Sequence, residues 1–117
     1  MSVAAVFVYL AHIVSYTEHP AVLRCCGDED IATQGCRRAA MSRALAARTD
    51  VIVDLRDLTF ADSSLMLDLA MIARRLRKAG RRLHLRYAQP QVWRVIEVVG
   101  VHRLPGVVAE RHTAVPV

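Results

Sequence analysis

Two adjacent serines follow an aspartate near the middle of the chain, where an apolar strand pattern gives way to a helical one. Residues 59–65 read TFADSSL, and the strand pattern before them covers residues 51–55. Hydroxyl and carboxylate oxygens at a helix start accept hydrogen bonds from its unpaired backbone N–H groups. The same position stabilises negative charge, including that of an added phosphate. The serines can therefore be ordinary helix caps, or a serine here can act as a phosphorylation switch if a kinase reaches it.

Catalysis by these serines would need a nearby base, and the sequence supplies none. There is no G-x-S-x-G turn, and none of the five histidines is placed near Ser63. A phosphate-binding G-x-x-x-x-G-K loop is also missing. The histidines lack H-x-x-x-H spacing, and Cys25 and Cys26 would point to opposite faces of a strand. We therefore expect no enzymatic activity, no metal and no other cofactor.

Length and composition indicate one globular domain. The chain has 117 residues, and because 54% of them are hydrophobic it can bury a sizeable core. The net charge of +5 raises nucleic acid as a partner, but aromatic residues make up only 5%, which leaves few surfaces for base stacking. We therefore expect no nucleic-acid partner. An odd number of cysteines, three, argues against a disulfide framework and favours reduced thiols in the cytoplasm, with Cys25 in the core.

The first 14 residues form a separate apolar segment. Residues 3–14 are almost wholly apolar, which is shorter than the roughly 20 residues that cross a bilayer. No basic residue precedes them, as a secretory signal would require. We interpret residues 1–14 as a buried strand or an extension lying on the sheet, and we expect no membrane association.

Strand and helix patterns alternate along the rest of the chain. The expected elements are strands at 21–26, 51–55 and 82–87, helices at 32–47, 63–79 and 90–99, and a brief strand after residue 101. Alternation at these lengths predicts parallel strands joined by crossover helices. Within residues 82–87, apolar and polar side chains alternate, so one face of the sheet is partly polar. The sequence therefore predicts an α/β fold, a small mixed and mostly parallel sheet with helices packed on one face.

The loops after residues 26 and 55 leave the same carboxyl edge of such a sheet, which is the usual place for ligands in open α/β sheets. We expect this edge to gather acidic side chains and both serines. Basic residues concentrate at 74–82, at the far end of the long helix, where they are typical of a solvated helix end.

Three segments carry a resemblance to a known family. Residues 27–33 contain a G-x-x-D loop that enters a helix, and residues 54–64 read DLRDLTFADSS, a D-L-x-x-x-x-F-x-D-S-S signature. A later match joins residues 80–83 with Pro90, Val95 and residues 100–104. Over about residues 21–105 the chain resembles the STAS domain, specifically the anti-anti-sigma factors, also called anti-sigma factor antagonists. It departs from them in having Leu65 where glycine is usual and no evident helix after Gly106.

The resemblance implies a single STAS domain over residues 15–110, with a C-terminal tail at 111–117. It implies a partner-switching protein that binds a histidine-kinase-like anti-sigma factor when unphosphorylated and so regulates transcription. That kinase would phosphorylate Ser63 and abolish binding, and a phosphatase would restore it. Asp30 and Asp62 carry over as positions that face the partner or organise the site, beside Ser63 and Ser64.

Two further residues extend the predicted partner surface. The core stripe of the long helix contains Leu65, Leu69, Ile72, Leu76 and Ala79, and Leu67 and Met71 lie off it. These two side chains can pack against a neighbouring helix, or they can form an apolar patch that docks the kinase.

Other functions remain open from the sequence. A constitutive STAS subunit that supports a transporter or a signalling complex keeps the fold but needs no phosphorylation. A small basic nucleic-acid-binding module is a third alternative. The sequence leaves the oligomeric state undetermined, and a homodimer is one of the options.

Overall fold

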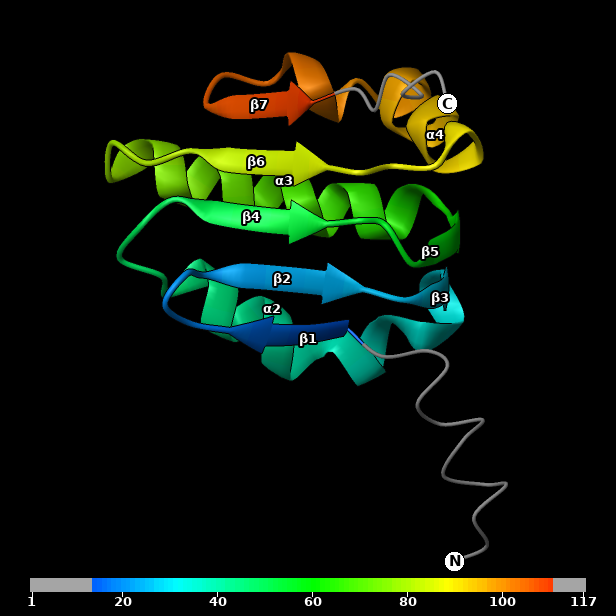
Figure 1. Ribbon diagram of the computed structural model, residues 1–117, viewed down its shortest axis with the longest axis horizontal. Helices are drawn as coiled ribbons and strands as arrows, with labels where there is room; N and C mark the ends of the chain where they lie inside the picture. The colour runs from blue at the N-terminus through cyan, green and yellow to red at the C-terminus, as the bar shows by residue number, and fades with distance from the viewer. Residues whose placement is uncertain (1–13, 111–117) are drawn as a thin grey trace, which may run out of the picture.

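A computed structural model of the protein describes residues 14–110, and these residues form a mixed β-sheet with helices on one face (Figure 1). The strand order is β1-β2-β4-β6-β7, and only β1 runs antiparallel to its neighbour. The strands are β1 (Val14–Thr17), β2 (Val22–Cys25), β4 (Val51–Asp54), β6 (Leu83–Arg86) and β7 (Val107–Glu110). The α/β fold with a small, mostly parallel sheet is therefore confirmed.

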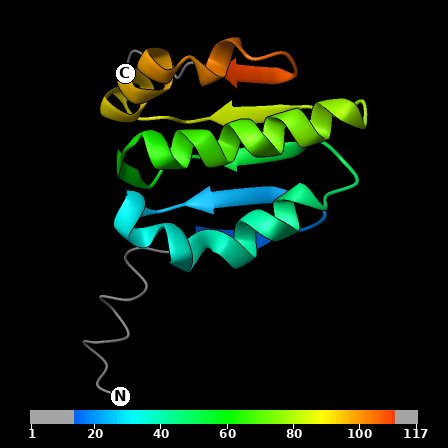
Figure 2. The same ribbon diagram turned by 180° about the vertical axis from the view of Figure 1, so that it is seen from behind.

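The two principal helices lie on the same side of this sheet. The helical elements are η1 (Ile31–Arg37), α2 (Arg38–Leu45), α3 (Ser63–Lys78), α4 (Pro90–Val99) and η2 (Val101–Arg103). Figure 2 shows α2 and α3 crossing in front of the strands, and Figure 1 shows the opposite face with the strands in front. The predicted single helical layer is thus confirmed. None of the helices between residues 14 and 110 is long and apolar enough to cross a membrane.

Strand alternation explains why the other face stays uncovered by these helices. Leu23, Val53 and Leu85 point into the core, whereas their neighbours Arg24, Asp54 and Arg86 point away from it. Strand register aligns these charged residues in one row, in which Arg24 Nε lies 3.7 Å from Asp54 Oδ2. Parallel sheets are usually buried on both faces, but a face carrying paired charges is compatible with water.

The core side of α3 follows the predicted stripe with one exception. Leu65, Leu69, Ile72 and Leu76 are buried, but Ala79 is the exposed residue that ends the helix. In the strands, Cys25 is buried as expected, and burial raises the pKa of its thiol, which keeps it protonated.

The predicted helix at 32–47 is in fact two elements, a 3-10 turn and a short α-helix. Asp30 Oδ1 accepts a hydrogen bond from the backbone of Thr33 at 3.1 Å, and the Thr33 hydroxyl accepts one from the backbone of Asp30 at 3.0 Å. This capping box starts η1 at Ile31, one residue before the predicted helix, and α2 continues it from Arg38. Helical periodicity in the sequence does not distinguish the two helix types.

Two segments expected to be loops form a second, two-stranded sheet. β3 (Gly27–Glu29) pairs in parallel with β5 (Leu58–Ala61) beyond the carboxyl ends of β2 and β4. The backbone of Asp62 extends this pairing by donating to the Glu29 carbonyl at 3.0 Å. The apolar N-terminal segment falls outside the described residues except for Val14, which begins β1, and so does the tail at 111–117.

Candidate functional site

The β3–β5 pair brings the starts of two helical elements side by side. Because Glu29 lies opposite Ala61, the next residues along each strand, Asp30 and Asp62, are neighbours. Asp30 caps η1 and Asp62 caps α3. The expected gathering of acidic groups at this edge is therefore built on strand pairing between segments about 30 residues apart in the chain.

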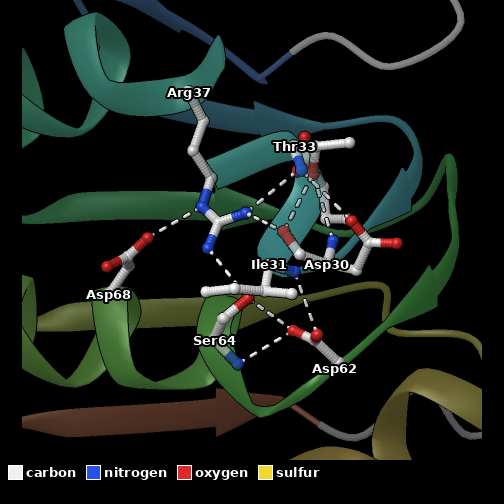
Figure 3. A network of polar contacts seen from close by, with 8 residues as sticks. Asp30, Ile31, Thr33, Arg37, Asp62, Ser64 and Asp68 are labelled. Carbon is white, nitrogen blue, oxygen red and sulfur yellow. Dashed lines mark hydrogen bonds and ion pairs between the residues drawn. The ribbon is translucent and has the colours of Figure 1, made fainter. Parts of the chain in front are cut away.

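Asp62 joins the two helix starts directly. Its Oδ1 accepts from the backbone N–H of Ser64 at 2.8 Å, and its Oδ2 accepts from that of Ile31 at 3.0 Å. Burial alone would raise the pKa of Asp62, but hydrogen bonds from Ser64, Ile31 and Leu65 together lower it. The carboxylate is thus held ionised and fixed between η1 and α3 (Figure 3).

The two serines of the signature have different environments. The Ser64 side chain is 8% exposed, and its hydroxyl donates to Asp62 and accepts from Arg37 Nη2 at 3.2 Å. Ser63, one residue earlier, is exposed, and no other residue of the described range forms a hydrogen bond with its hydroxyl. Ser63 therefore presents a free hydroxyl at the first position of α3, whereas Ser64 is committed to the structure.

A buried arginine organises the inner side of this site, and the sequence analysis did not find it. Arg37 has no exposed surface, and its guanidinium faces two carboxylates. Its Nε lies 2.7 Å from Asp68 Oδ2, and its Nη1 lies 3.1 Å from Glu29 Oε2. Nη1 also donates to the Asp30 carbonyl at 3.0 Å. Figure 3 shows this guanidinium between η1 and the first turns of α3.

The Arg37 network ties η1, β3 and α3 together. A buried guanidinium is costly unless its donors and its charge are satisfied, and here two carboxylates, a carbonyl and a hydroxyl satisfy it. The Thr33 hydroxyl also donates to Glu29. The helical spacing could have predicted that Arg37 is buried, because it lies four residues before the buried Met41 and hence on the inward face of the helical pattern.

Leu67 and Met71 are largely exposed and do not belong to the core. Their exposed fractions are 60% and 61%, and they follow Ser63 along α3 at intervals of four residues. Side chains at this spacing lie on the same side of a helix. We call Ser63, Leu67 and Met71 the outer face of α3. Two more exposed apolar side chains, Ile31 and Phe60, lie on η1 and β5.

Two kinds of contact are missing at the site in the part of the chain that the structure describes. Between residues 14 and 110, no histidine forms a hydrogen bond with either serine. No three His, Cys, Asp or Glu side chains of this range are grouped so that they could hold a metal ion.

Sequence comparison identifies the family. A family model described as "Mlab, STAS domain" matches residues 12–108. The chain belongs to the STAS domain family. No curated protein sequence matches the chain significantly.

Solved structures show the same STAS fold. One is the anti-sigma factor antagonist SpoIIAA in its unphosphorylated form, with 24% identity and a TM-score of 0.61 over 79% of this chain and 80% of that one. Another is SLC26A9, with 15% identity and a TM-score of 0.57. That match covers 93% of this chain but only 24% of SLC26A9, so this STAS domain corresponds to a small part of that protein.

Proposed function

We propose that this STAS domain is a cytoplasmic anti-sigma factor antagonist that is switched off by phosphorylation of Ser63. The observation that carries the proposal is the difference between the two serines: Ser63 has an exposed, free hydroxyl, and Ser64 is buried in a hydrogen-bond network. The similarity to the unphosphorylated anti-sigma factor antagonist SpoIIAA supports the same function for this fold.

In its unphosphorylated state, the domain would bind an anti-sigma factor of the histidine-kinase-like type. Leu67 and Met71 supply exposed apolar contacts beside Ser63, in an arrangement suited to the buried centre of an interface. Asp30, Asp62 and Ser64 would contribute to binding mainly by holding the starts of η1 and α3 in place. Binding would release a sigma factor from the kinase and permit transcription.

Phosphorylation would then break the complex electrostatically. The kinase transfers the γ-phosphoryl group of ATP to Ser63 Oγ, which loses its proton, and ADP leaves. The phosphate adds a charge of about −1.5 to −2. The first turn of α3 tolerates this charge, because its backbone N–H groups and helix dipole favour anions. A carboxylate of the partner about 6 Å away would be repelled by roughly 1–5 kcal/mol, depending on the local dielectric. A phosphatase would hydrolyse the ester and restore binding.

Phosphotransfer tests the proposal directly. The protein is incubated with ATP and candidate histidine-kinase-like anti-sigma factors from the same genome, and the modified residue is mapped by mass spectrometry. We expect one phosphate per chain on Ser63, lost in Ser63→Ala and retained in Ser64→Ala once that variant is shown to be folded. Modification of Ser64 in preference to Ser63 would contradict the proposal.

Binding measurements test the electrostatic step separately. Ser63→Ala should bind the anti-sigma factor with the affinity of the unphosphorylated wild type. Ser63→Asp should weaken binding about tenfold or more, and a factor of ten corresponds to about 1.4 kcal/mol. Isothermal titration calorimetry on both variants makes the comparison. Equal affinities would refute the electrostatic mechanism.

A second candidate function is a constitutive STAS subunit of a transporter or a signalling complex. The match to a 24% segment of SLC26A9 favours it, because it shows this fold as one part of a longer chain. Stable co-purification with a membrane protein, unaffected by Ser63→Asp, would support this alternative over the switch.

A further inference from the structure

A hollow lies toward the other end of α3, away from both serines. It has a volume of about 290 Å³ and is lined by Ala70, Arg74, Arg77, Leu104 and Pro105. The first three residues belong to α3, and the last two precede β7. Since α3 rises 1.5 Å per residue, Arg74 lies roughly 16 Å along the helix from Ser63.

The segment that forms one wall of this hollow runs close against α3, which forms the other wall. Gly106 has a φ of 84°, and a Cβ atom at this position would lie 3.3 Å from Arg77 Cβ, so the chain here runs close against the stem of Arg77. The Gly106 carbonyl accepts from the backbone of Leu83 at 2.9 Å, and Val107 donates to the Leu104 carbonyl at 3.1 Å. The hollow therefore lies between α3 and a segment that is held in place by its own backbone hydrogen bond and by one to β6.

The hollow carries positive charge that no neighbouring carboxylate neutralises in the described part of the chain. Arg74 and Arg77 are exposed, and neither forms an ion pair with any residue of the described range. By contrast, Arg24, Arg37 and Arg86 each lie within 4 Å of a carboxylate. No acidic residue lines the hollow, and its remaining lining is apolar, with Leu104 38% exposed. The exposed Met71 lies three residues before Arg74 on the same helix.

We propose that this hollow binds an acidic, amphipathic segment of a partner protein, with its carboxylates on Arg74 and Arg77 and an apolar side chain beside Leu104. Guanidinium groups suit carboxylates because they pair with both oxygens in one plane. The volume is just below the range of about 300–1,000 Å³ for small-molecule sites, so it suits one or two side chains. The lining contains no aromatic residue on which a nucleic-acid base could stack.

This inference does not depend on the switch at Ser63, because the hollow lies on different turns of α3. One partner could contact both surfaces, since a typical interface covers about 800 Å² on each side. A protein that binds here without any kinase is equally compatible with the geometry.

Nuclear magnetic resonance can locate the site with a defined probe. The isotope-labelled protein is titrated with a synthetic 18-residue helical peptide that carries leucines on one face and glutamates on the other. A matched peptide has glutamine in place of glutamate. We expect the glutamate peptide to shift the amide signals of Ala70, Arg74, Arg77, Leu104 and Gly106, and the glutamine peptide to bind about tenfold more weakly or worse.

Charge reversal separates the hollow from the overall basic charge. In Arg74→Glu/Arg77→Glu, affinity for the glutamate peptide should fall about tenfold or more. The control Arg75→Glu/Lys78→Glu changes the net charge equally on the same helix, but these residues do not line the hollow. We expect less than about a threefold loss for the control.

Several results would overturn the inference. One is an equal loss of peptide affinity in the two double variants, and another is equal affinity of the wild type for the two peptides. Signal shifts centred on Leu67 and Ser63, or no signal shifts at 1 mM peptide, would also contradict it. Tighter binding of a DNA duplex, falling steeply with salt, would assign the arginines to nucleic acid instead. Phosphotransfer to Ser63 in Arg74→Glu/Arg77→Glu, measured in parallel, distinguishes failure of this site from failure of the proposed switch.

Discussion

The first turns of α3 have a serine on the inner face and another on the outer face, and the two serines have different environments. On the inner face, Ser64 and Asp68 face the buried Arg37, and their contacts with its guanidinium hold η1 against α3. On the outer face, Ser63 leaves its hydroxyl free among exposed apolar side chains. Adjacent residues of a helix differ by about 100° in direction, so one step along the chain separates a structural serine from an available one.

The proposed phosphorylation of Ser63 would place the added charge on the outer face, away from the inner network. A phosphate added to the inner face would enter a closed network beside two carboxylates, Glu29 and Asp68. Added to the outer face, it meets solvent and the positive end of the helix dipole. In the proposed switch, the inner network would therefore hold the helix start in place while the Ser63 hydroxyl gains the charge of a phosphate.

The largest effect should come from removing the centre of the inner network. Arg37→Ala leaves the Glu29 and Asp68 carboxylates without their shared cation, and we expect the free energy of unfolding to fall by about 3–5 kcal/mol. Urea denaturation measures it. The control is Arg38→Ala, an exposed neighbour with no ion pair in the described range, which should cost less than about 0.5 kcal/mol. Similar costs for both would mean that the network is not needed for folding.

The second largest effect should be the difference in stability between alanine variants of the two serines. Ser64→Ala removes a hydroxyl that satisfies Arg37 Nη2 and Asp62, so we expect a loss of about 1–3 kcal/mol. Ser63→Ala removes an exposed hydroxyl and should change stability by less than about 0.5 kcal/mol. Thermal unfolding of the two variants tests this difference. A larger loss of stability for Ser63→Ala than for Ser64→Ala would reverse the assignment of inner and outer faces.

Apolar residues of α3 should show the same division. Met71→Ala should leave the free energy of unfolding within about 0.5 kcal/mol of the wild type, because the side chain is 61% exposed. Its partner affinity should fall by about 1 kcal/mol or more. Leu69→Ala, a matched truncation in the core, should cost about 2–5 kcal/mol in stability. If Met71→Ala were strongly destabilising, this side chain would belong to the core.

The smallest effect concerns pH. Hydrogen bonds in the folded state lower the pKa of Asp62, so its contribution to stability is fully present above the unfolded value of about 3.9. This contribution is lost as the pH falls through the lower folded pKa. The difference in unfolding free energy between the wild type and Asp62→Asn should therefore shrink between pH 6 and pH 3. A difference that stays constant over this range would show that the charge of Asp62 does not stabilise the cap.

Much of the fold was predictable because it depends on local pattern. Alternating strands, the helical stripe of α3 and Pro90 at the start of α4 led to the correct order and type of these elements. The two-stranded β3–β5 sheet was missed, because three residues of Gly27–Glu29 carry no strand pattern and pair only with a distant segment. The 3-10 geometry of η1 was missed for a related reason, since it depends on the capping contacts of Asp30 and Thr33.

By itself, the sequence determined the sheet with its single helical layer, and it marked the aspartate and two serines at the start of the long helix. These follow from periodicity and from the preference of short polar side chains for helix ends. Only the tertiary structure decided which serine is available, because that depends on Arg37, 27 residues before Ser64 in the chain. It also decided that Arg74 and Arg77 border a hollow, since the opposite wall comes from the segment before β7. Contacts between distant segments produce no periodic pattern of residues in the sequence, because the segments come together only when the chain folds.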